Sequence, residues 1–170
     1  MRKKNEGFSL IELIVVIAIM TILTVGIAIS LSSVSSQKAK AAIKTIYSSL
    51  EYTQTAAMAK ATAYLEIYQK DDGYYLAVVE GSATQPVCKE KKLCDDSVTI
   101  SYTTKGSMVA QKIDETPLQI TYDHVTGVIL PVGNAADGSP IYCNGIIVSK
   151  GSYEGQIDLV PETGHCQMRD

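Results

Sequence analysis

The feature of this sequence that most limits its fold is the apolar run over residues 8–31. Its 24 residues include one charged side chain, Glu12, and otherwise consist of apolar residues with a few Ser, Thr and Gly. A helix of about 20 apolar residues is long enough to span a bilayer. Three cations, Arg2, Lys3 and Lys4, precede the run. They favour a cytoplasmic position for this end, so we expect the C-terminal part of the chain to be exported.

Two common kinds of membrane segment each explain only some features of this run. A secretory signal peptide, cleaved near Ala28-Ile29-Ser30, would need only about 7–15 apolar residues. A plain single-span anchor explains the length of the run but not Glu12, because a charged side chain in hydrocarbon costs about 3 kcal/mol by insertion scales. The anchor remains open if Glu12 lies near the interface and extends its carboxylate toward water.

A third interpretation accounts for both the acid and its position. The stretch Gly7-Phe8-Ser9-Leu10-Ile11-Glu12 resembles the class III leader junction of type IV prepilins and pseudopilins, and the resemblance covers residues 1–31. It implies that residues 1–7 are a leader peptide, that a prepilin peptidase cuts between Gly7 and Phe8, and that the new amino group of Phe8 is methylated. It also implies that the apolar helix is retained, with Glu12 at the family's acidic position.

Physical chemistry gives Glu12 a role that agrees with this resemblance. A helix beginning near Phe8 has unpaired amides and the positive end of its dipole there, which favours a nearby carboxylate. The amine of cleaved Phe8, from the same or a neighbouring subunit, can therefore pair with Glu12, and a paired buried acid is tolerated better than a lone one. Pairing between subunits selects one axial offset, and a head-to-tail contact that does not close generates a helical filament.

Residues 8–61 are predicted to form one long helix, because no proline occurs before Pro86. Its first part, residues 8–31, is the expected transmembrane and filament-core segment. Beyond it, apolar residues recur every three or four positions, which predicts an amphipathic continuation over residues 32–61. These recurring residues are Ala39, Ile43, Ile46, Leu50, Thr53 and Ala57.

The remaining residues, 62–170, are predicted to form an antiparallel β head, which makes the fold class α+β. Alternating segments at 64–69 and 74–79 flank Lys70-Asp71-Asp72-Gly73 and predict a hairpin. Further strands are expected between turn signals at 98–103, 107–112, 118–122, 127–130, 141–149 and 156–160. With late turns at Thr126-Gly127 and Thr163-Gly164, this order is loosely similar to H-type minor pseudopilins and minor pilins over residues 47–166.

Two positions in the apolar run depart from the common pilin pattern. The helix-breaking proline of many major pilins is Ile29 here, and a glycine often found midway is Thr21, with Gly26 nearby. These departures favour a minor pilin or pseudopilin over a dominant structural pilin.

Four cysteines, Cys88, Cys94, Cys143 and Cys166, all fall in the expected head. An even number in an exported domain favours disulfides, with three connectivities open. Pairing between the cysteines that are nearest in the sequence favours Cys88–Cys94 and Cys143–Cys166. Free thiols remain an alternative. Neither pair has the close spacing typical of a structural zinc site, so we expect no metal ion, and His165 is expected to be incidental.

The sequence contains no residue spacing typical of an enzyme active site. Asp123 and His124 are neighbours in an expected turn rather than parts of a catalytic triad. The cations Lys89, Lys91 and Lys92 are offset by nearby acids and are expected to lie in a solvated loop. We therefore expect a protein that is not an enzyme and that has no cofactor.

The resemblance implies a type IV pilin-like subunit that is assembled through its N-terminal helix into a pilus or pseudopilus. The expected partners are other pilin subunits, the prepilin peptidase, and the assembly platform and ATPase in the membrane, with nucleic acid only in a competence-type filament. Removing the leader, whose formal charge is +2, takes the chain from −3 to −5, which disfavours nucleic-acid binding by the bulk surface. The alternative is a single-span surface binding protein that does not polymerise.

Overall fold

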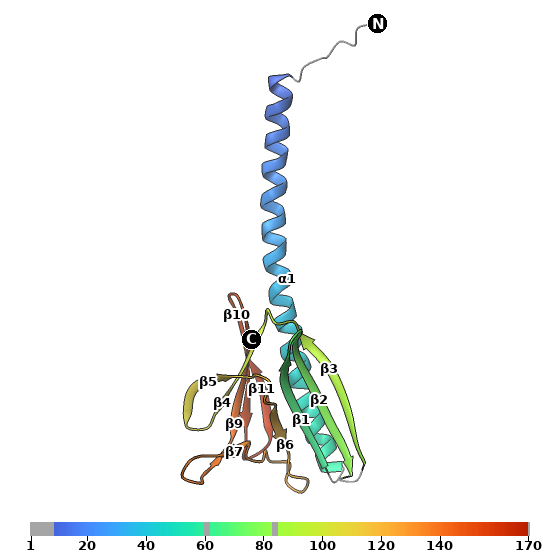
Figure 1. Ribbon diagram of the computed structural model, residues 1–170, viewed down its shortest axis with the longest axis vertical. Helices are drawn as coiled ribbons and strands as arrows, with labels where there is room; N and C mark the ends of the chain where they lie inside the picture. Colours follow the sequence, from blue (N-terminus) through green and yellow to red (C-terminus); the bar gives the residue numbers. More distant parts are fainter. Residues whose placement is uncertain (1–8, 60–61, 83–84, 170) are drawn as a thin grey trace. The chain divides into compact units, whose positions relative to one another are not determined.

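The computed structural model describes residues 9–59, 62–82 and 85–169, without the side chains of residues 23–35, 62, 82, 85 and 108. It divides into two units, Met1–Ser35 and Ser36–Asp170. A long helix is followed by antiparallel sheets, so the predicted α+β class is confirmed (Figure 1).

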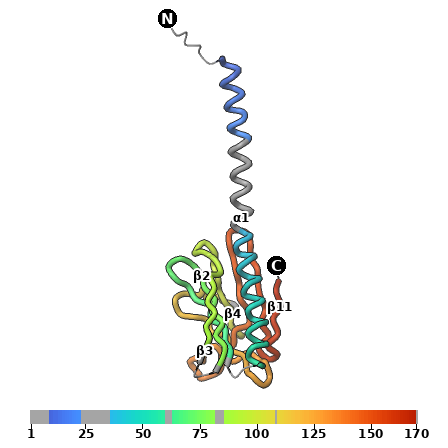
Figure 2. The backbone as a smooth tube through the Cα atoms, turned by 90° about the vertical axis from the view of Figure 1, so that its right-hand side faces the viewer, coloured from blue at the N-terminus to red at the C-terminus, as the bar shows by residue number. Residues whose placement is uncertain are grey.

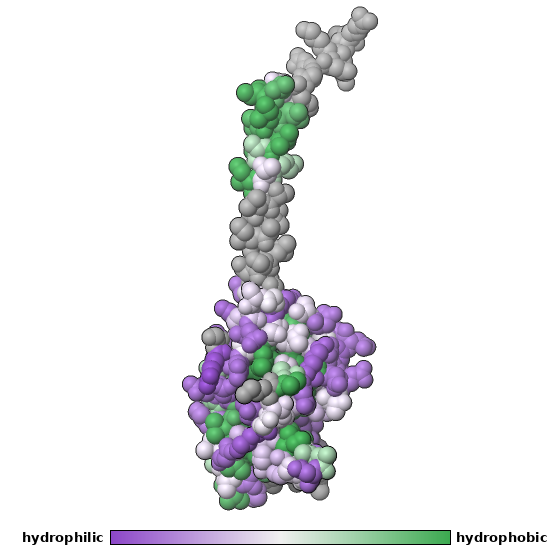
Figure 3. Space-filling view, turned by 90° about the vertical axis from the view of Figure 1, so that its left-hand side faces the viewer, coloured by the Kyte–Doolittle hydropathy of each residue, from purple (hydrophilic) through white to green (hydrophobic). Residues whose placement is uncertain are grey.

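Helix α1 comprises Leu10–Ala59 and belongs to both units. In the first unit its described apolar side chains are exposed, from 76 % at Leu10 to 45 % at Val16. On the face that Figure 3 shows, they form an apolar surface (green). Among the described residues, no helix combines the length and the hydropathy that crossing a membrane requires. Residue 8 and the side chains of residues 23–31, which belong to the expected span, lie outside this description.

In the second unit, which we call the head, α1 is amphipathic as the sequence predicted. Ala39, Ile43, Ile46 and Leu50 are fully buried. Thr53 continues the stripe because its hydroxyl donates to the Ser49 carbonyl at 2.7 Å, which satisfies its polar group inside the core.

The first sheet of the head has the order β3-β2-β1-β6. Its strands are β1 (Thr62–Lys70), β2 (Gly73–Ser82), β3 (Gln85–Cys94) and β6 (Leu118–Thr121). The predicted hairpin is confirmed, because β1 and β2 pair from Thr62↔Gly81 to Lys70↔Gly73. Gly73 has a φ of +134°, and a Cβ there would lie 2.1 Å from the Cys94 carbonyl oxygen, so the position requires glycine.

The second sheet has the order β11-β10-β9-β4-β5. Its strands are β4 (Thr99–Thr104), β5 (Ser107–Lys112), β9 (Cys143–Lys150), β10 (Tyr153–Val160) and β11 (His165–Arg169), and β7 (Gly133–Asn134) pairs separately with β8 (Pro140–Ile141). The strand expected at 127–130 is wrong, since that segment forms only the isolated bridge Tyr122↔Ile129. Strand β11 runs beside the head part of α1 (Figure 2).

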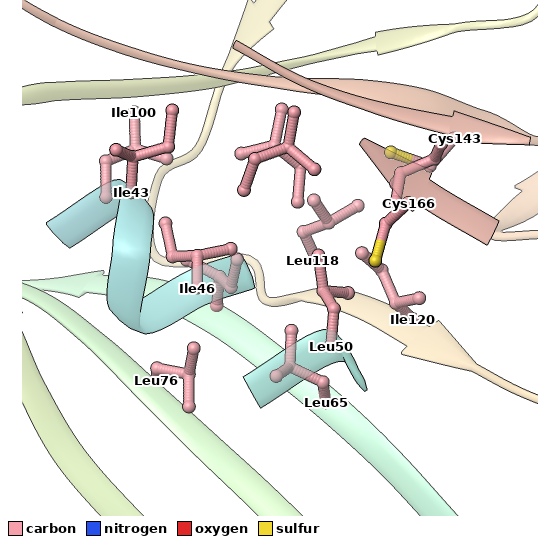
Figure 4. Close-up of a cluster of buried hydrophobic side chains, with 14 of the residues drawn as sticks. Ile43, Ile46, Leu50, Leu65, Leu76, Ile100, Leu118, Ile120, Cys143 and Cys166 are labelled. Carbon is pink, nitrogen blue, oxygen red and sulfur yellow. The ribbon is translucent and has the colours of Figure 1, made fainter. Parts of the chain in front are cut away.

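The core of the head lies between α1 and the two sheets. Ile43, Ile46 and Leu50 of α1 face Leu65 of the first sheet and Ile100 of the second (Figure 4). Each of these side chains is fully buried, and such burial contributes about 1.5–3 kcal/mol per side chain. The amphipathic stripe therefore fixes the helix against both sheets.

Two turns that are distant in sequence meet beside α1. Gln54 Nε2 donates a hydrogen bond to the Gly127 carbonyl oxygen at 3.1 Å. A Cβ added to Gly164, whose φ is +69°, would lie 1.9 Å from that same oxygen. The Ile129 amide donates to the Pro161 carbonyl at 2.9 Å. The late Thr-Gly turns thus hold the β10–β11 connection against the helix.

Candidate functional site

The N-terminal segment is the candidate functional site, and its described part begins at Ser9. The amides of Glu12 and Leu13 donate to the Ser9 carbonyl oxygen at 3.0 and 3.2 Å, and α1 begins at Leu10. Glu12 therefore lies in the first turn, where the helix dipole favours a negative charge, and it is exposed. Gly7 and Phe8 lie outside the described residues, so cleavage, methylation and pairing of the Phe8 amine remain predictions.

Ser9 is a residue of this site that the sequence analysis missed. Its signal is the spacing Ser9-Leu10-Ile11-Glu12, which is the S-x-x-E pattern of a capping box. In that pattern the serine precedes the helix and the glutamate is its third residue, and the backbone hydrogen bonds of Glu12 and Leu13 agree with this start. The spacing therefore places Glu12 at the capping position of the helix start, in addition to the pairing between subunits that the sequence predicts.

The structure corrects the predicted Cys88–Cys94 disulfide. Both residues lie on the single strand β3, opposite Val79 and Tyr74 of β2. Six residues of extended chain separate their Cα atoms by about 20 Å, whereas a disulfide requires less than about 7 Å. Both thiols are free, Cys88 exposed and Cys94 buried, and burial raises the pKa of Cys94 to about 11.

The predicted Cys143–Cys166 disulfide is not formed either. Cys143 lies on β9 and Cys166 on β11, and these strands flank β10 on opposite sides. Two strand spacings separate them by about 10 Å, beyond the reach of a disulfide without movement of the backbone. Both are free and buried (Figure 4), and burial raises the pKa of Cys143 to about 12 and that of Cys166 to about 11.

The lysines expected in a solvated loop lie instead on strand β3. Lys89 donates to the Glu80 carboxylate, which is nearly buried on β2, and Tyr52 of α1 donates to the two oxygens of that carboxylate at 3.1 and 3.0 Å. Lys92 pairs with Asp72 at 2.6 Å. These contacts attach the edge strand to the rest of the head.

A second polar cluster, centred on Asp95, joins three parts of the head. Its carboxylate accepts a hydrogen bond from Lys38 of α1 at 2.6 Å and another from Ser97, and Lys150 of β9 lies 3.9 Å away. The hydrogen bond from Lys38, followed by that from Ser97, holds the pKa of Asp95 well below its usual range. Because the two lysines lie on α1 and β9, far from Asp95 in the sequence, sequence spacing gave no signal for this cluster.

The carboxylate of Asp123, beside His124, is held by hydrogen bonds within its own turn. Its carboxylate accepts hydrogen bonds from the Val125 amide at 3.1 Å and from the Thr126 amide and hydroxyl at 2.8 and 2.6 Å. The bonds from Thr126 lower the pKa of Asp123. Within the described residues, no group of three or more His, Cys, Asp or Glu side chains is placed to hold a metal ion.

Comparison with known families decides what the N-terminal segment is. Residues 2–28 match the family described as the prokaryotic N-terminal methylation motif. This chain has a class III, prepilin-type leader. The match includes the Gly7-Phe8 junction and continues into the apolar part of α1. No curated protein and no solved structure matches the chain.

Proposed function

We propose that the chain is a minor type IV pilin-like subunit. A prepilin peptidase cuts between Gly7 and Phe8, Phe8 is methylated, and the mature chain assembles through α1 into a pilus or pseudopilus. The observation that carries this proposal is the methylation motif at residues 2–28, which continues into a helix with exposed apolar side chains. The departures at Ile29 and Thr21 support a minor subunit.

The exposed apolar surface of α1 suits assembly from within a membrane. Leu10, Ile11 and Ile22 are each at least 70 % exposed. Their side chains are therefore available to contact lipid or a neighbouring subunit. Lipid tails are as apolar as these side chains, so burial alone gives little drive for helices to associate in a bilayer. Specific packing and the charge of Glu12 then decide which axial offset the subunits adopt.

In this proposal the head is exported and interacts, and it performs no catalysis. The subunit is held in the cytoplasmic membrane before assembly and lies in an extracellular or periplasm-spanning filament afterwards. Its partners are other pilin subunits, the peptidase, and the assembly platform with its ATPase. Nucleic acid is a partner only if the filament serves DNA uptake.

The test is mass analysis of the mature N-terminus. We expect a chain that begins at Phe8 and carries one additional methyl group. An intact Met1, or a start near Ser30, would contradict processing by a prepilin peptidase.

A single-span surface binding protein that never polymerises is the second candidate, favoured by the ordinary charged surface of the head (Figure 3, purple). Shearing filaments from cells and probing them for the chain separates the two. The pilin proposal requires the chain in the sheared fraction, whereas the anchored protein would remain with the membranes.

A further inference from the structure

Strand β3 is a long and exposed edge of the head. It pairs with β2, and no other described strand pairs with it (Figure 1). Its residues 86–92 are all exposed, so both faces of the strand meet solvent. Pro86 and the lysines that follow are residues that oppose indiscriminate backbone pairing at a sheet edge. A partner of this strand would therefore have to match its side chains.

The charge of β3 is positive and only partly neutralised. Lys89 and Lys92 are held by Glu80 and Asp72, and Glu90 of the same strand is held by Lys70 at 2.6 Å. Lys91 is exposed and forms no ion pair with any residue that the structure describes. The strand thus offers one free cation between two fixed ones.

An open cleft of about 510 Å³ lies beside the β1–β2 turn, where the segment after β3 and the segment before β6 also contribute to its lining. Its acids are Asp71, Asp96, Asp114 and Glu115. The lysine in its lining is Lys70, which is already paired with Glu90. None of the four acids forms an ion pair with a described residue, so the cleft retains an excess of negative charge.

We propose that β3 of one copy docks against this cleft in a second copy, with Lys91 entering beside Asp96 and Glu115. This inference rests on the proposed assembly into filaments. The lining of the cleft shares no residue with β3, although Lys70 of the cleft pairs with Glu90 of that strand, so the contact joins two different but adjoining surfaces. A contact between two different surfaces repeats along a filament when the rotation between copies does not close a ring. The matched charges compensate locally for the repulsion between acidic chains.

The experiment uses filaments that contain the full-length chain, assembled from a mixture of unlabelled and ¹⁵N-labelled copies. A carbodiimide joins lysines directly to carboxylates, and mass spectrometry identifies the joined peptides. We expect mixed-label products that join Lys91 to Asp96 or Glu115. Filaments that contain the chain but lack these products would overturn the contact, whereas absence of the chain from filaments would overturn the proposed function.

Charge reversal provides the matched control. Lys91→Glu and Glu115→Lys should each lower recovery of the chain in filaments by about tenfold, the effect of losing and reversing one or two exposed ion pairs. A chain with both substitutions should regain part of the lost recovery, because the exchanged charges at positions 91 and 115 again match between copies while Asp96 still opposes the new acid. Lys44→Glu, at an exposed position on α1, should leave recovery unchanged. An equal loss in all variants, or a double variant no better than the singles, would refute the contact.

Discussion

Gly164 is the position where the structure makes its sharpest stability prediction. Its φ of +69° is left-handed, and a Cβ there would lie 1.9 Å from the Gly127 carbonyl oxygen and 2.6 Å from Gln54 Nε2. The left-handed conformation costs an alanine about 1–2 kcal/mol. The overlap adds about 1–3 kcal/mol, as overpacking does elsewhere, because backbone cannot move aside as a flexible side chain can.

Gly151 separates these two costs. Its φ is +61°, and nothing lies within 4 Å of an added Cβ. We expect Gly164→Ala to lower the free energy of unfolding by about 2–5 kcal/mol and Gly151→Ala by about 1–2 kcal/mol. Asparagine tolerates the left-handed region, so Gly151→Asn should be nearly neutral, whereas Gly164→Asn should remain strongly destabilising.

The measurement is thermal unfolding of the full-length chain in detergent, followed by near-ultraviolet circular dichroism of the head tyrosines. Gly164→Ala should lower Tm by about 8–15 °C relative to the parent chain. Equal shifts for alanine at the two glycines would show that conformation alone matters. They would also show that the meeting of the two Thr-Gly turns is not tightly packed.

The remaining predictions concern titration and thiol reactivity. Because the folded pKa of Asp95 is lowered by Lys38, its stabilising effect should be complete above the usual Asp pKa and lost as pH falls through the folded value. Asp95→Asn should therefore lower Tm at neutral pH and flatten the acid side of the Tm–pH profile, whereas an unchanged profile would contradict the cluster. In the native chain, a maleimide at about pH 8 should label exposed Cys88 quickly and buried Cys143 only on unfolding. Labelling of fewer than four thiols in unreduced, unfolded protein would show that a disulfide forms.

The parts of the fold that follow local periodicity could be predicted from the sequence. The stripe through Ile43, Ile46 and Leu50 faces the core, and the hairpin around Asp71-Asp72 has the expected strands. These features repeat at 3.6 or 2 residues because one face is buried. The prepilin-type leader could also be predicted, because its motif is carried by neighbouring residues of one short segment.

Strand β3 could not be predicted in this way. Both faces of residues 86–92 are exposed, so burial imposes no alternation of apolar and polar side chains. Its stability comes from pairing with β2 and from distant partners such as Glu80, which lies on another strand. The expected Cys88–Cys94 disulfide also predicted a loop where the structure has this strand. The position of Lys91 on an edge strand and the gathering of acids in the cleft therefore follow from the three-dimensional structure and not from the sequence pattern.

Glu12 has two physical roles that one pair of substitutions separates. As the third residue after Ser9 it occupies the position from which Glu or Gln completes a capping box. As the acid closest in sequence to the described start of α1, it also supplies a charge for the amine of cleaved Phe8. Glu12→Gln keeps the capping geometry and removes the charge, whereas Glu12→Ala removes both.

The expected result follows from the size of the two effects. Losing a helix cap costs about 1 kcal/mol, whereas leaving one member of a buried charge pair without its partner costs about 3–5 kcal/mol. We therefore expect both variants to be cleaved normally and both to be lost from filaments, as measured by N-terminal mass and by recovery in the sheared fraction. Filaments formed by Glu12→Gln but not by Glu12→Ala would assign the acid to capping. Normal filaments with both would leave specific packing of the apolar surface of α1 as the sole determinant of the axial offset.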